Sequence, residues 1–299
     1  MNTPFVSVII PDLNDSKRLK ICLEALENQT YHKNLYEVIV VDNDSEENIQ
    51  VLVTNFSQAK FICESRPGSY TARNKGLSIA KGDVIAFTDS DCIPAKDWIE
   101  NGVRNLINVS NCGLVAGRIE IFFKNPDKPT AVELYESIIE FPQNLFVEVQ
   151  RFGATANLFT FKSVIDRIGV FNDNLKSGGD VEWGNRVFSS GLNLIYADDT
   201  VVLHPSRNSL KDLFKKHIRV AGGQYNLRIE RSRYALLKLL EDISRELFPS
   251  INSIHFIISN EIFKQINLHQ KLKVILVGLS VRLLRVMEKL RLLFGGRAR

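Results

Sequence analysis

The stretch "GDVIAFTDSDC", residues 82–92, runs an apolar segment from Val84 to Phe87 directly into two carboxylates, Asp89 and Asp91. The apolar run predicts a buried strand. Two carboxylates one residue apart repel each other in an apolar setting, so they need hydrogen bonds or a cation at the end of that strand. A bound metal ion would meet this need, and the sequence around the pair offers no obvious alternative.

Further along the chain, apolar strand patterns alternate with helical ones. "FVSVII" (5–10), "YEVIVVD" (36–42) and "KFICE" (60–64) read as strands, and apolar residues recur at helical spacing over 16–26 and 69–80. This alternation predicts an α/β protein with a mostly parallel sheet flanked by helices. Such sheets bind ligands at the carboxyl ends of their strands. Asn14, Asp42 and Asp89 each follow a predicted strand, so we expect them to meet at one edge.

The second half of the chain is less regular. Strands are predicted over 113–123, at the start of 153–171 and over 199–207, a helix over 129–141, and only helices after residue 209. The segment "KSGGDVEWGNRVFSSG" places Asp180 near the start of a helix, where it can act as the N-terminal cap. Glu182 and Arg186 follow at the i, i+4 spacing of a helical ion pair.

Charge and cysteine content limit the classes of protein. The net charge is +4, but residues 270–299 alone carry +7, so the rest of the chain is slightly acidic and lacks the basic surface of a nucleic-acid binder. The four cysteines form no zinc-finger or CxxC spacing, which fits a reducing compartment. The N-terminal residues resemble no secretory leader. We therefore expect a cytoplasmic protein.

The segment 270–299 differs in composition from everything before it. It is rich in Leu, Ile and Val, but charged side chains interrupt it, so crossing a bilayer would bury several charges. We expect it to lie on the inner face of the cell membrane as an interfacial helix with basic flanks. The alternative is packing on its own domain or on a second subunit of a homo-oligomer. The predicted apolar stripe is Ile275, Leu279, Leu283, Val286, Leu290 and Leu293.

Five stretches resemble, in order and spacing, the inverting glycosyltransferases of family 2, which have the GT-A nucleotide-sugar fold. They are "VSVIIPDLN" (6–14), "VIVVDNDS" (38–45), "ARNKGLSIAKGDVIAFTDSDC" (72–92), "GGDVEWGNR" (178–186) and "VVLHPSR" (201–207). The chain departs from the common family pattern at Asp12 and Leu13, where Thr and Tyr are usual, and at Gly179, where Glu is common. The resemblance implies a catalytic domain over 1–225, with a nucleotide-binding half (1–110) and an acceptor-binding half (111–225), followed by a helical extension over 226–299.

The resemblance also implies roles for individual residues. Asp42 would accept the imide hydrogen bond of a uracil base, and Asp91 and His204 would bind Mn²⁺ or Mg²⁺ together with Asp89. Asp180 would be the general base of an inverting transfer, taking the proton of the acceptor hydroxyl. The implied nucleotide-sugar contacts are Pro11, Asn14, Asp42, Arg73, Lys75, Asp89 and Ser90. The implied acceptor contacts are Gly179, Glu182 and Trp183.

The predicted activity is therefore metal-dependent transfer of a sugar from a nucleotide sugar, a UDP-sugar by resemblance, to a hydroxyl of a glycan or lipid-linked acceptor. Two alternatives stay open at this point. A non-catalytic nucleotide-sugar-binding protein would keep the same pocket. An aspartyl phosphatase also uses a DxD pair, but that class generally places the pair after its first strand rather than after the fourth.

Overall fold

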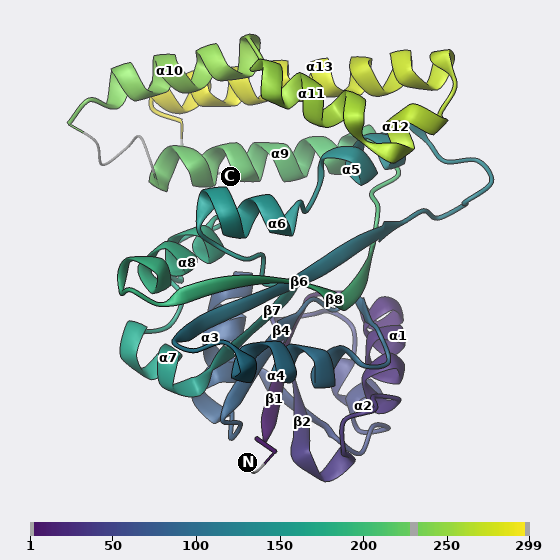
Figure 1. The fold of residues 1–299 in the computed structure, drawn as a ribbon, viewed down its shortest axis with the longest axis vertical. Helices are drawn as coiled ribbons and strands as arrows, with labels where there is room; N and C mark the ends of the chain where they lie inside the picture. Colours follow the sequence, from purple (N-terminus) through teal and green to yellow (C-terminus); the bar gives the residue numbers. More distant parts are fainter. Residues whose placement is uncertain (1–2, 228–232, 297–299) are drawn as a thin grey trace. The chain divides into compact units, whose positions relative to one another are not determined.

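The computed structural model describes residues 3–227 and 233–296 (Figure 1). The chain forms two compact units. Unit 1 comprises Met1–Glu120, Phe141–Asn174 and Gly179–His204, and unit 2 comprises Ile121–Glu140, Leu175–Gly178 and Pro205–Arg299. Segments 121–140 and 205–225 therefore group with the C-terminal helices, although the sequence favoured a single boundary at residue 225. The functional assignment of the domains stays a prediction.

The sheet of unit 1 has eight strands in the order β3-β2-β1-β4-β7-β6-β8-β5. Its first four strands are parallel, as the alternating pattern predicts, whereas β7 pairs antiparallel with both β4 and β6, and β5 pairs antiparallel with β8. The sheet is thus mixed, and its parallel part is confined to the first half of the chain. The strands are β1 (Val6–Asp12), β2 (Tyr36–Asp42), β3 (Ala59–Cys63), β4 (Val84–Thr88), β5 (Ile93–Pro94), β6 (Cys112–Phe122), β7 (Asn157–Phe161) and β8 (Asn193–Pro205).

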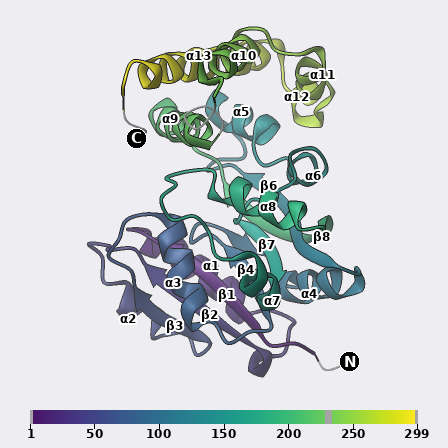
Figure 2. The ribbon, with the colours of Figure 1, turned by 90° about the vertical axis from the view of Figure 1, so that its left-hand side faces the viewer.

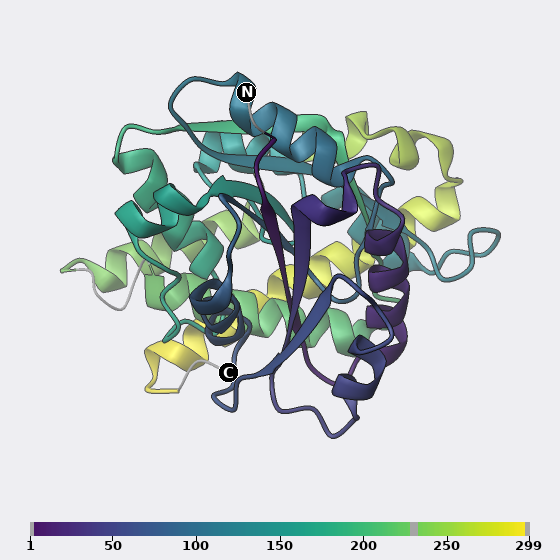
Figure 3. The same cartoon turned by 90° about the horizontal axis from the view of Figure 1, so that it is seen from below.

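Helices cover both faces of the parallel strands, and α1 and α3 lie on opposite sides of β1 and β2 (Figures 2 and 3). All residues of β2 and β4 are buried, which explains their continuous apolar sequences. Gly76 allows α3 to pack closely, because a Cβ there would lie 2.6 Å from Ile9 Cγ2. The helical segments of unit 1 are α1 (Ser16–Glu27), η1 (Lys33–Leu35), α2 (Ile49–Val53), α3 (Ser69–Ile79), α4 (Trp98–Asn108), α6 (Gln143–Leu145), η2 (Phe146–Gln150), α7 (Lys162–Ile168) and α8 (Gly179–Ser189).

Unit 2 is helical throughout its second half, as expected from residue 209 onward. In Figures 1 and 2, α5 and α9 form one layer and α10 and α13 lie over it. Its core joins Tyr135 and Ile138 of α5 to Leu213 of α9 and to Val274 and Val277 of α13. The helices are α5 (Ala131–Ile139), α9 (Leu210–Tyr225), α10 (Ala235–Leu247), α11 (Ile251–Ser259), α12 (Glu261–Gln265) and α13 (Leu268–Leu293).

The long helix α13 has two apolar faces. Val274, Val277 and Val281 point into the unit 2 core, while the opposite side of the helix is exposed. Of the six stripe positions predicted from the sequence, only Val286 is half-buried; the exposed ones are Ile275, Leu279, Leu283, Leu290 and Leu293. Within residues 3–227 and 233–296, no helix has the length and apolarity needed to cross a bilayer.

Candidate active site

The ends of β1 and β2 are held together at the edge where the sequence predicts a ligand. Asp12 and Asp42 are register partners on these two parallel strands. Asn14, with a left-handed φ of 54°, donates its backbone N–H to Ser45 Oγ (2.8 Å) and accepts the Glu46 N–H at Oδ1 (2.7 Å). The loops after the two strands are thereby fixed to each other, with Pro11 half-buried just before them.

The two carboxylate oxygens of Asp42 have different surroundings: one stabilises a turn, and the other can accept a hydrogen bond from a ligand. Its Oδ1 accepts the Ser45 N–H at 3.1 Å, which is the local turn contact that any Asp at a strand end can make. Its Oδ2 accepts no hydrogen bond from the described residues. The turn therefore orients the carboxylate, and one oxygen stays available to a donor on a ligand.

Asn43 was missed by the sequence reasoning, although it organises the neighbouring loop. Its Nδ2 donates to the carbonyls of Glu64 (2.7 Å) and Arg66 (2.8 Å), and its Oδ1 accepts the Gly68 N–H (2.7 Å). Gly68 precedes α3 with a φ of 130°, so a single buried amide links the end of β2 to the start of α3. Only its position beside Asp42 could have pointed to it, because its partners lie more than twenty residues away.

Arg73, in α3, lies nearly buried between two carboxylates. Its Nη2 donates to Asp89 Oδ1, and its charge lowers the pKa of Asp180 against the effect of burial. Lys75, two residues further along α3, is half-buried, and its charge acts on Glu64 instead. The two basic residues predicted as phosphate partners therefore have different surroundings, and Arg73 is the one placed beside Asp89.

Asp91 belongs to the three-residue group that could hold a metal ion. Its Oδ1 lies 3.8 Å from His204 Nε2, and ligand atoms of Asp91, Cys92 and His204 all fall within 4.8 Å of one another. Burial raises the pKa of Asp91, the negative charge of Asp89 adds to the rise, and His204 opposes it. A bound cation would stabilise the ionised form of a carboxyl group whose pKa is raised in this way.

The donor set is mixed rather than purely oxygen. Burial raises the pKa of the Cys92 thiol well above its usual range, so Cys92 is the member of the three-residue group least disposed to bind an ion as a thiolate. The remaining donors, carboxylate oxygen and imidazole nitrogen, suit Mn²⁺ better than Mg²⁺, which prefers all-oxygen coordination. Cys92 was not foreseen as a neighbour of the site, although it follows Asp91 directly.

Arg18, which the sequence reasoning also missed, reaches the same carboxylates from α1. Its Nη2 lies 2.6 Å from Asp15 Oδ2 and its Nη1 lies 3.5 Å from Asp91 Oδ2, while half of the side chain stays exposed. The signal that could have indicated Arg18 is its position in the first turn of α1, which follows the end of β1 directly. Arg18 adds a forked cation close to the position expected for a diphosphate.

Asp180 lies in the first turn of α8 rather than at its cap, because the helix already begins at Gly179. Its Oδ1 accepts hydrogen bonds from Tyr70 Oη (3.2 Å) and from the Val181 N–H (3.0 Å). Burial raises the pKa of the carboxyl group, and Arg73 and these hydrogen bonds limit the rise. A carboxylate with a raised pKa is a stronger base, which is the property that proton abstraction requires.

The three residues expected to contact the acceptor fall in different environments. Gly179 lies against Tyr70, whose ring would be 2.8 Å from any Cβ at that position, so the glycine makes room for the tyrosine that holds Asp180. Glu182 forms the predicted ion pair with Arg186, at 2.8 and 3.0 Å, which occupies both carboxylate oxygens. Trp183 is completely buried, and its indole donates to the Gly169 carbonyl at 2.9 Å. Trp183 is therefore a core residue and cannot contact an acceptor in this structure.

Asp12 is a buried carboxylate whose two oxygens accept no hydrogen bond from the described residues. Burial raises its pKa to about 6; the nearby Ser90 hydroxyl and Asp15 N–H lower it, and the charges of Asp15 and Asp42 add to the rise. Ser90 is itself buried between Asp89 and Asp91. Asp12, at the end of β1, thus adds to the negative charge at the carboxyl ends of the strands.

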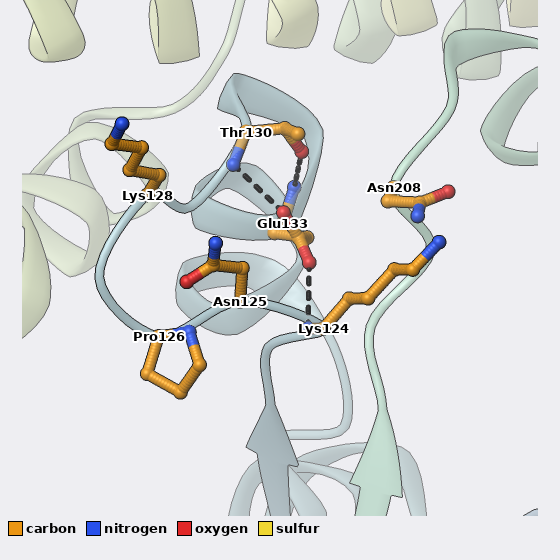
Figure 4. Close-up of a pocket in the computed structure, with 7 residues that line it drawn as sticks. All are labelled: Lys124, Asn125, Pro126, Lys128, Thr130, Glu133 and Asn208. Carbon is orange, nitrogen blue, oxygen red and sulfur yellow. Dashed lines mark hydrogen bonds between the residues drawn. The ribbon is translucent and has the colours of Figure 1, made fainter.

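A separate hollow of about 400 Å³ opens in unit 2 around Lys124 and Lys128 (Figure 4). The one carboxylate that lines it, Glu133, closes the capping box of α5 with Thr130 and also accepts the Lys124 N–H at 2.9 Å. These groups already hydrogen-bond to one another. None of the predicted site residues lines this hollow.

Comparison with known proteins identifies the family of the chain. The family model of glycosyl transferase family 2 matches residues 7–169. Glycosyltransferase AglE of Haloferax volcanii is 38% identical over 226 residues, which cover 74% of this chain and 73% of that protein. The dolichyl N-acetyl-alpha-D-glucosaminyl phosphate 3-beta-D-2,3-diacetamido-2,3-dideoxy-beta-D-glucuronosyltransferase of Methanococcus voltae is 22% identical over 248 residues, covering 79% and 77% of the two chains.

Among solved structures, the mannosyltransferase PcManGT of Pyrobaculum calidifontis, in complex with GDP-Man and Mn²⁺, is similar in fold. The TM-score is 0.63 at 17% identity, and the match covers 97% of this chain and 88% of that one. This likeness confirms the predicted GT-A fold, with helices flanking the central sheet and C-terminal helices after it, although the sheet is mixed rather than mostly parallel. The family model spans more than half of the chain, and with the AglE relative it shows that the chain belongs to glycosyltransferase family 2.

Proposed function

We propose that the chain is a metal-dependent, inverting glycosyltransferase that moves a sugar from a UDP-sugar to a hydroxyl group of a glycan or lipid-linked acceptor. The observation that supports this most is the position of Arg73, which pairs with Asp89 of the DxD sequence and acts electrostatically on Asp180. The diphosphate end of a donor and the base that activates an acceptor would then share one site. The activity is placed in the cytoplasm, at the inner face of the membrane.

In the donor site, Asp42 would accept the N3–H of uracil with the oxygen that its turn leaves available, while Pro11 and Asn14 border the base. Arg73 and Arg18 would face the diphosphate. Asp89, Asp91 and His204 would hold Mn²⁺ in preference to Mg²⁺. When bound, the ion supplies electrostatic stabilisation of the negative charge on the departing nucleotide diphosphate.

Asp180 would act on the acceptor. Its carboxylate takes the proton of the acceptor hydroxyl while that oxygen bonds to the anomeric carbon, and the bond from that carbon to the diphosphate oxygen breaks. One displacement inverts the anomeric configuration, so no second nucleophile is needed. Tyr70 keeps the carboxylate in place through its hydroxyl, and Gly179 gives Tyr70 the space to do so.

Two features of relatives bear on the substrates. The PcManGT complex contains GDP-Man, so a guanine nucleotide is the competing donor to test against UDP. The name of the Methanococcus voltae relative describes a dolichyl-phosphate-linked acceptor, which favours a lipid-linked acceptor here. Peripheral contact with the membrane through residues 270–299 belongs to the same proposal, since α13 keeps most of the predicted stripe exposed. A homo-oligomer stays a prediction from the sequence.

The test is a thermal-shift screen of UDP- and GDP-sugars with and without Mn²⁺, followed by product analysis. A donor at 100 times its dissociation constant should add about 2.7 kcal/mol to the free energy of unfolding, and only when Mn²⁺ is present. Incubation of that donor with an acceptor should yield free nucleoside diphosphate and a product of inverted configuration. Binding with neither transfer nor hydrolysis would identify a non-catalytic binder, and release of inorganic phosphate would identify a phosphatase.

A further inference from the structure

An apolar groove opens in unit 2 between α5, α11 and α13. Its volume is about 260 Å³, and its walls include Tyr135, Ile138, Ile258 and Val274, with Arg282 as the single charged lining residue. The volume corresponds to roughly nine water molecules at ~30 Å³ each, yet the walls offer few polar partners to hold water. A hydrocarbon chain matches such a space better than a polar ligand does.

The groove opens into a larger exposed apolar surface. Ile275 and Leu279 line the groove and also belong to the exposed side of α13, which continues with Leu276, Leu283 and Met287, the first of them 62% exposed. The neighbouring helices add exposed side chains of the same kind: Leu236, Leu237, Leu240 and Leu247 of α10, Phe248 after it, and Ile251, Ile254 and Ile258 of α11. Exposed apolar side chains in this number on three helices of one unit favour a site of interaction.

The charges of these helices leave a positive excess. Residues 233–296 hold ten basic and five acidic side chains. Each acidic one has an ion-pair partner: Glu241 with Arg245, Glu261 with Lys264, Glu288 with Arg291, Asp242 with Lys289, and Glu246 with Lys289 and Arg285. Among the described residues no carboxylate lies within 4 Å of Lys271, Lys273 or Arg282.

These three cations without a carboxylate partner flank the apolar stripe of α13, although Lys271 also donates to the Lys264 carbonyl (3.5 Å) and lies over the Phe263 ring. At 100° per residue, Lys273 lies on one side of the line through Leu276 and Leu283, and Lys271 and Arg282 lie on the other. Arg282 gives two hydrogen bonds to backbone carbonyls of Arg245 and Glu246, at 3.3 and 2.9 Å, which orient its guanidinium without neutralising it. Flanking cations beside an exposed apolar stripe are the arrangement of a helix at an anionic lipid surface.

We infer that the exposed faces of α10, α11 and α13 lie on an anionic bilayer and that the groove receives one hydrocarbon chain of a bilayer phospholipid. The ionic groups favour this occupant over a second copy of the chain. A two-fold pairing of this surface would bring Lys273 and Arg282 of both copies to the same rim, where like charges repel. Anionic headgroups would neutralise the same side chains. The inference does not depend on the glycosyl transfer proposed for unit 1.

Gly278, in the middle of α13, allows the groove to be closed without adding charge. A Cβ at this position would lie 3.3 Å from Tyr135 Cε2, a tight contact that a small shift of the ring relieves, so Gly278→Ala is the mild change, whereas Gly278→Leu places a large side chain at the Tyr135 wall of the groove. Both substitutions raise helix propensity, so α13 should still form. The double variant Leu276→Glu, Leu283→Glu changes the exposed surface outside the groove. Ile107→Glu, on α4 of unit 1, is the matched control for a charge placed at an exposed apolar position.

The experiment has two measurements on the full chain. Sedimentation with vesicles should recover the wild type and Ile107→Glu with phosphatidylcholine–phosphatidylglycerol but not with phosphatidylcholine alone, salt should weaken the binding, and the double Glu variant should stay in solution. Binding of the fluorescent fatty acid cis-parinarate should be similar for the wild type and Gly278→Ala and about tenfold weaker for Gly278→Leu.

Three results would overturn the inference. They are a wild type that ignores anionic vesicles, cis-parinarate binding that Gly278→Leu leaves unchanged, and a concentration-dependent dimer that the double Glu variant dissociates while vesicle binding is absent. Nucleotide binding with Mn²⁺ is measured on the same samples. If no sample, wild type included, binds a nucleotide, the proposed glycosyl transfer is contradicted and the lipid inference is unaffected.

Discussion

The two units leave different groups unsatisfied. In unit 1, Asp12 is buried without a hydrogen bond from the described residues, and burial raises the pKa values of Asp91 and Asp180. In unit 2, every carboxylate of α10–α13 has a basic partner, but large apolar side chains are left uncovered. Unit 1 therefore leaves buried carboxylates incompletely neutralised, and unit 2 leaves apolar side chains without contact. We expect the ligand proposed for each unit to meet that deficit.

The largest effect should come from removing the metal group. Asp91→Asn takes away one of the two carboxylates of the DxD sequence and one of the three grouped ligands. We expect transfer to be abolished, and both Mn²⁺ affinity and Mn²⁺-dependent nucleotide binding to fall, as EDTA should do to the wild type. Isothermal titration with Mn²⁺ and a transfer assay measure this. His204→Ala should be milder, and full activity of Asp91→Asn in metal-free buffer would contradict the metal role.

Changing the proposed base should affect turnover without affecting donor binding. Asp180→Asn keeps the size of the side chain and loses its basicity, so kcat should fall by roughly 10² to 10⁴. Nucleotide affinity should change little, because Asp180 is proposed to act on the acceptor. Tyr70→Phe is the companion variant: it removes one hydrogen bond to Asp180, so it should lower kcat less. If Asp180→Asn loses nucleotide binding in proportion, its role is structural.

In unit 2 the comparison predicts that breaking an internal ion pair costs stability. Lys289 is 2% exposed and lies 3.0 Å from Glu246 Oε1 and 3.7 Å from Asp242 Oδ2. Lys289→Met should lower the free energy of unfolding by about 2–4 kcal/mol, because Asp242 and Glu246 lose one basic partner at a buried position while Glu246 keeps Arg285. Lys273→Met, at an exposed position, should change it by less than about 0.5 kcal/mol. Denaturant titration distinguishes the two, and equal losses would show that burial of the pair is unimportant.

The parallel half of unit 1 could be predicted from the sequence because its signals are local. β1, β2 and β4 are continuous apolar runs, and a strand-end position such as Asp42 or Asp89 follows directly from where each run stops. The antiparallel pairing of β7 with β4 and β6 could not be predicted, since its register partners are about seventy residues apart for β4 and about forty for β6. The GT-A fold itself was expected from the resemblance of five motifs rather than from periodicity.

Within the site, the missed residues share one property. Asn43 acts through partners more than twenty residues away, and Arg18 and Cys92 meet Asp91 and His204 respectively only in the folded chain, so a local pattern alone does not reveal their roles. Trp183 shows the opposite error: its place in the motif that holds Asp180 suggested an acceptor contact, but its side chain is completely buried and donates its indole N–H to the Gly169 carbonyl. On α13, five of the six positions of the predicted stripe lie on the exposed side of the helix. The valine side that packs into the core was not predicted, because finding one apolar stripe does not show whether a helix has a second.

The smallest effect concerns Asp12, and it is a gain in stability. The folded-state pKa of Asp12 is raised to about 6 from an ordinary value of 3.8, so between these values the folded protein binds more protons than the unfolded chain. The free energy of unfolding contributed by Asp12 therefore falls as the pH rises through this window and stays low above it. Asp12→Asn removes the charge at similar size. It should raise the free energy of unfolding at pH 8 in EDTA by about 1–3 kcal/mol, with a difference that vanishes below about pH 4.

The exposed Asp44→Asn is the control and should change little. Adding Mn²⁺ should shrink the gain, because a cation at Asp91 and His204 supplies the positive charge that the apo site lacks. A gain that is equal at pH 4 and pH 8 would mean that Asn improves packing, and no gain at any pH would show that Ser90 and the Asp15 N–H already satisfy the carboxylate.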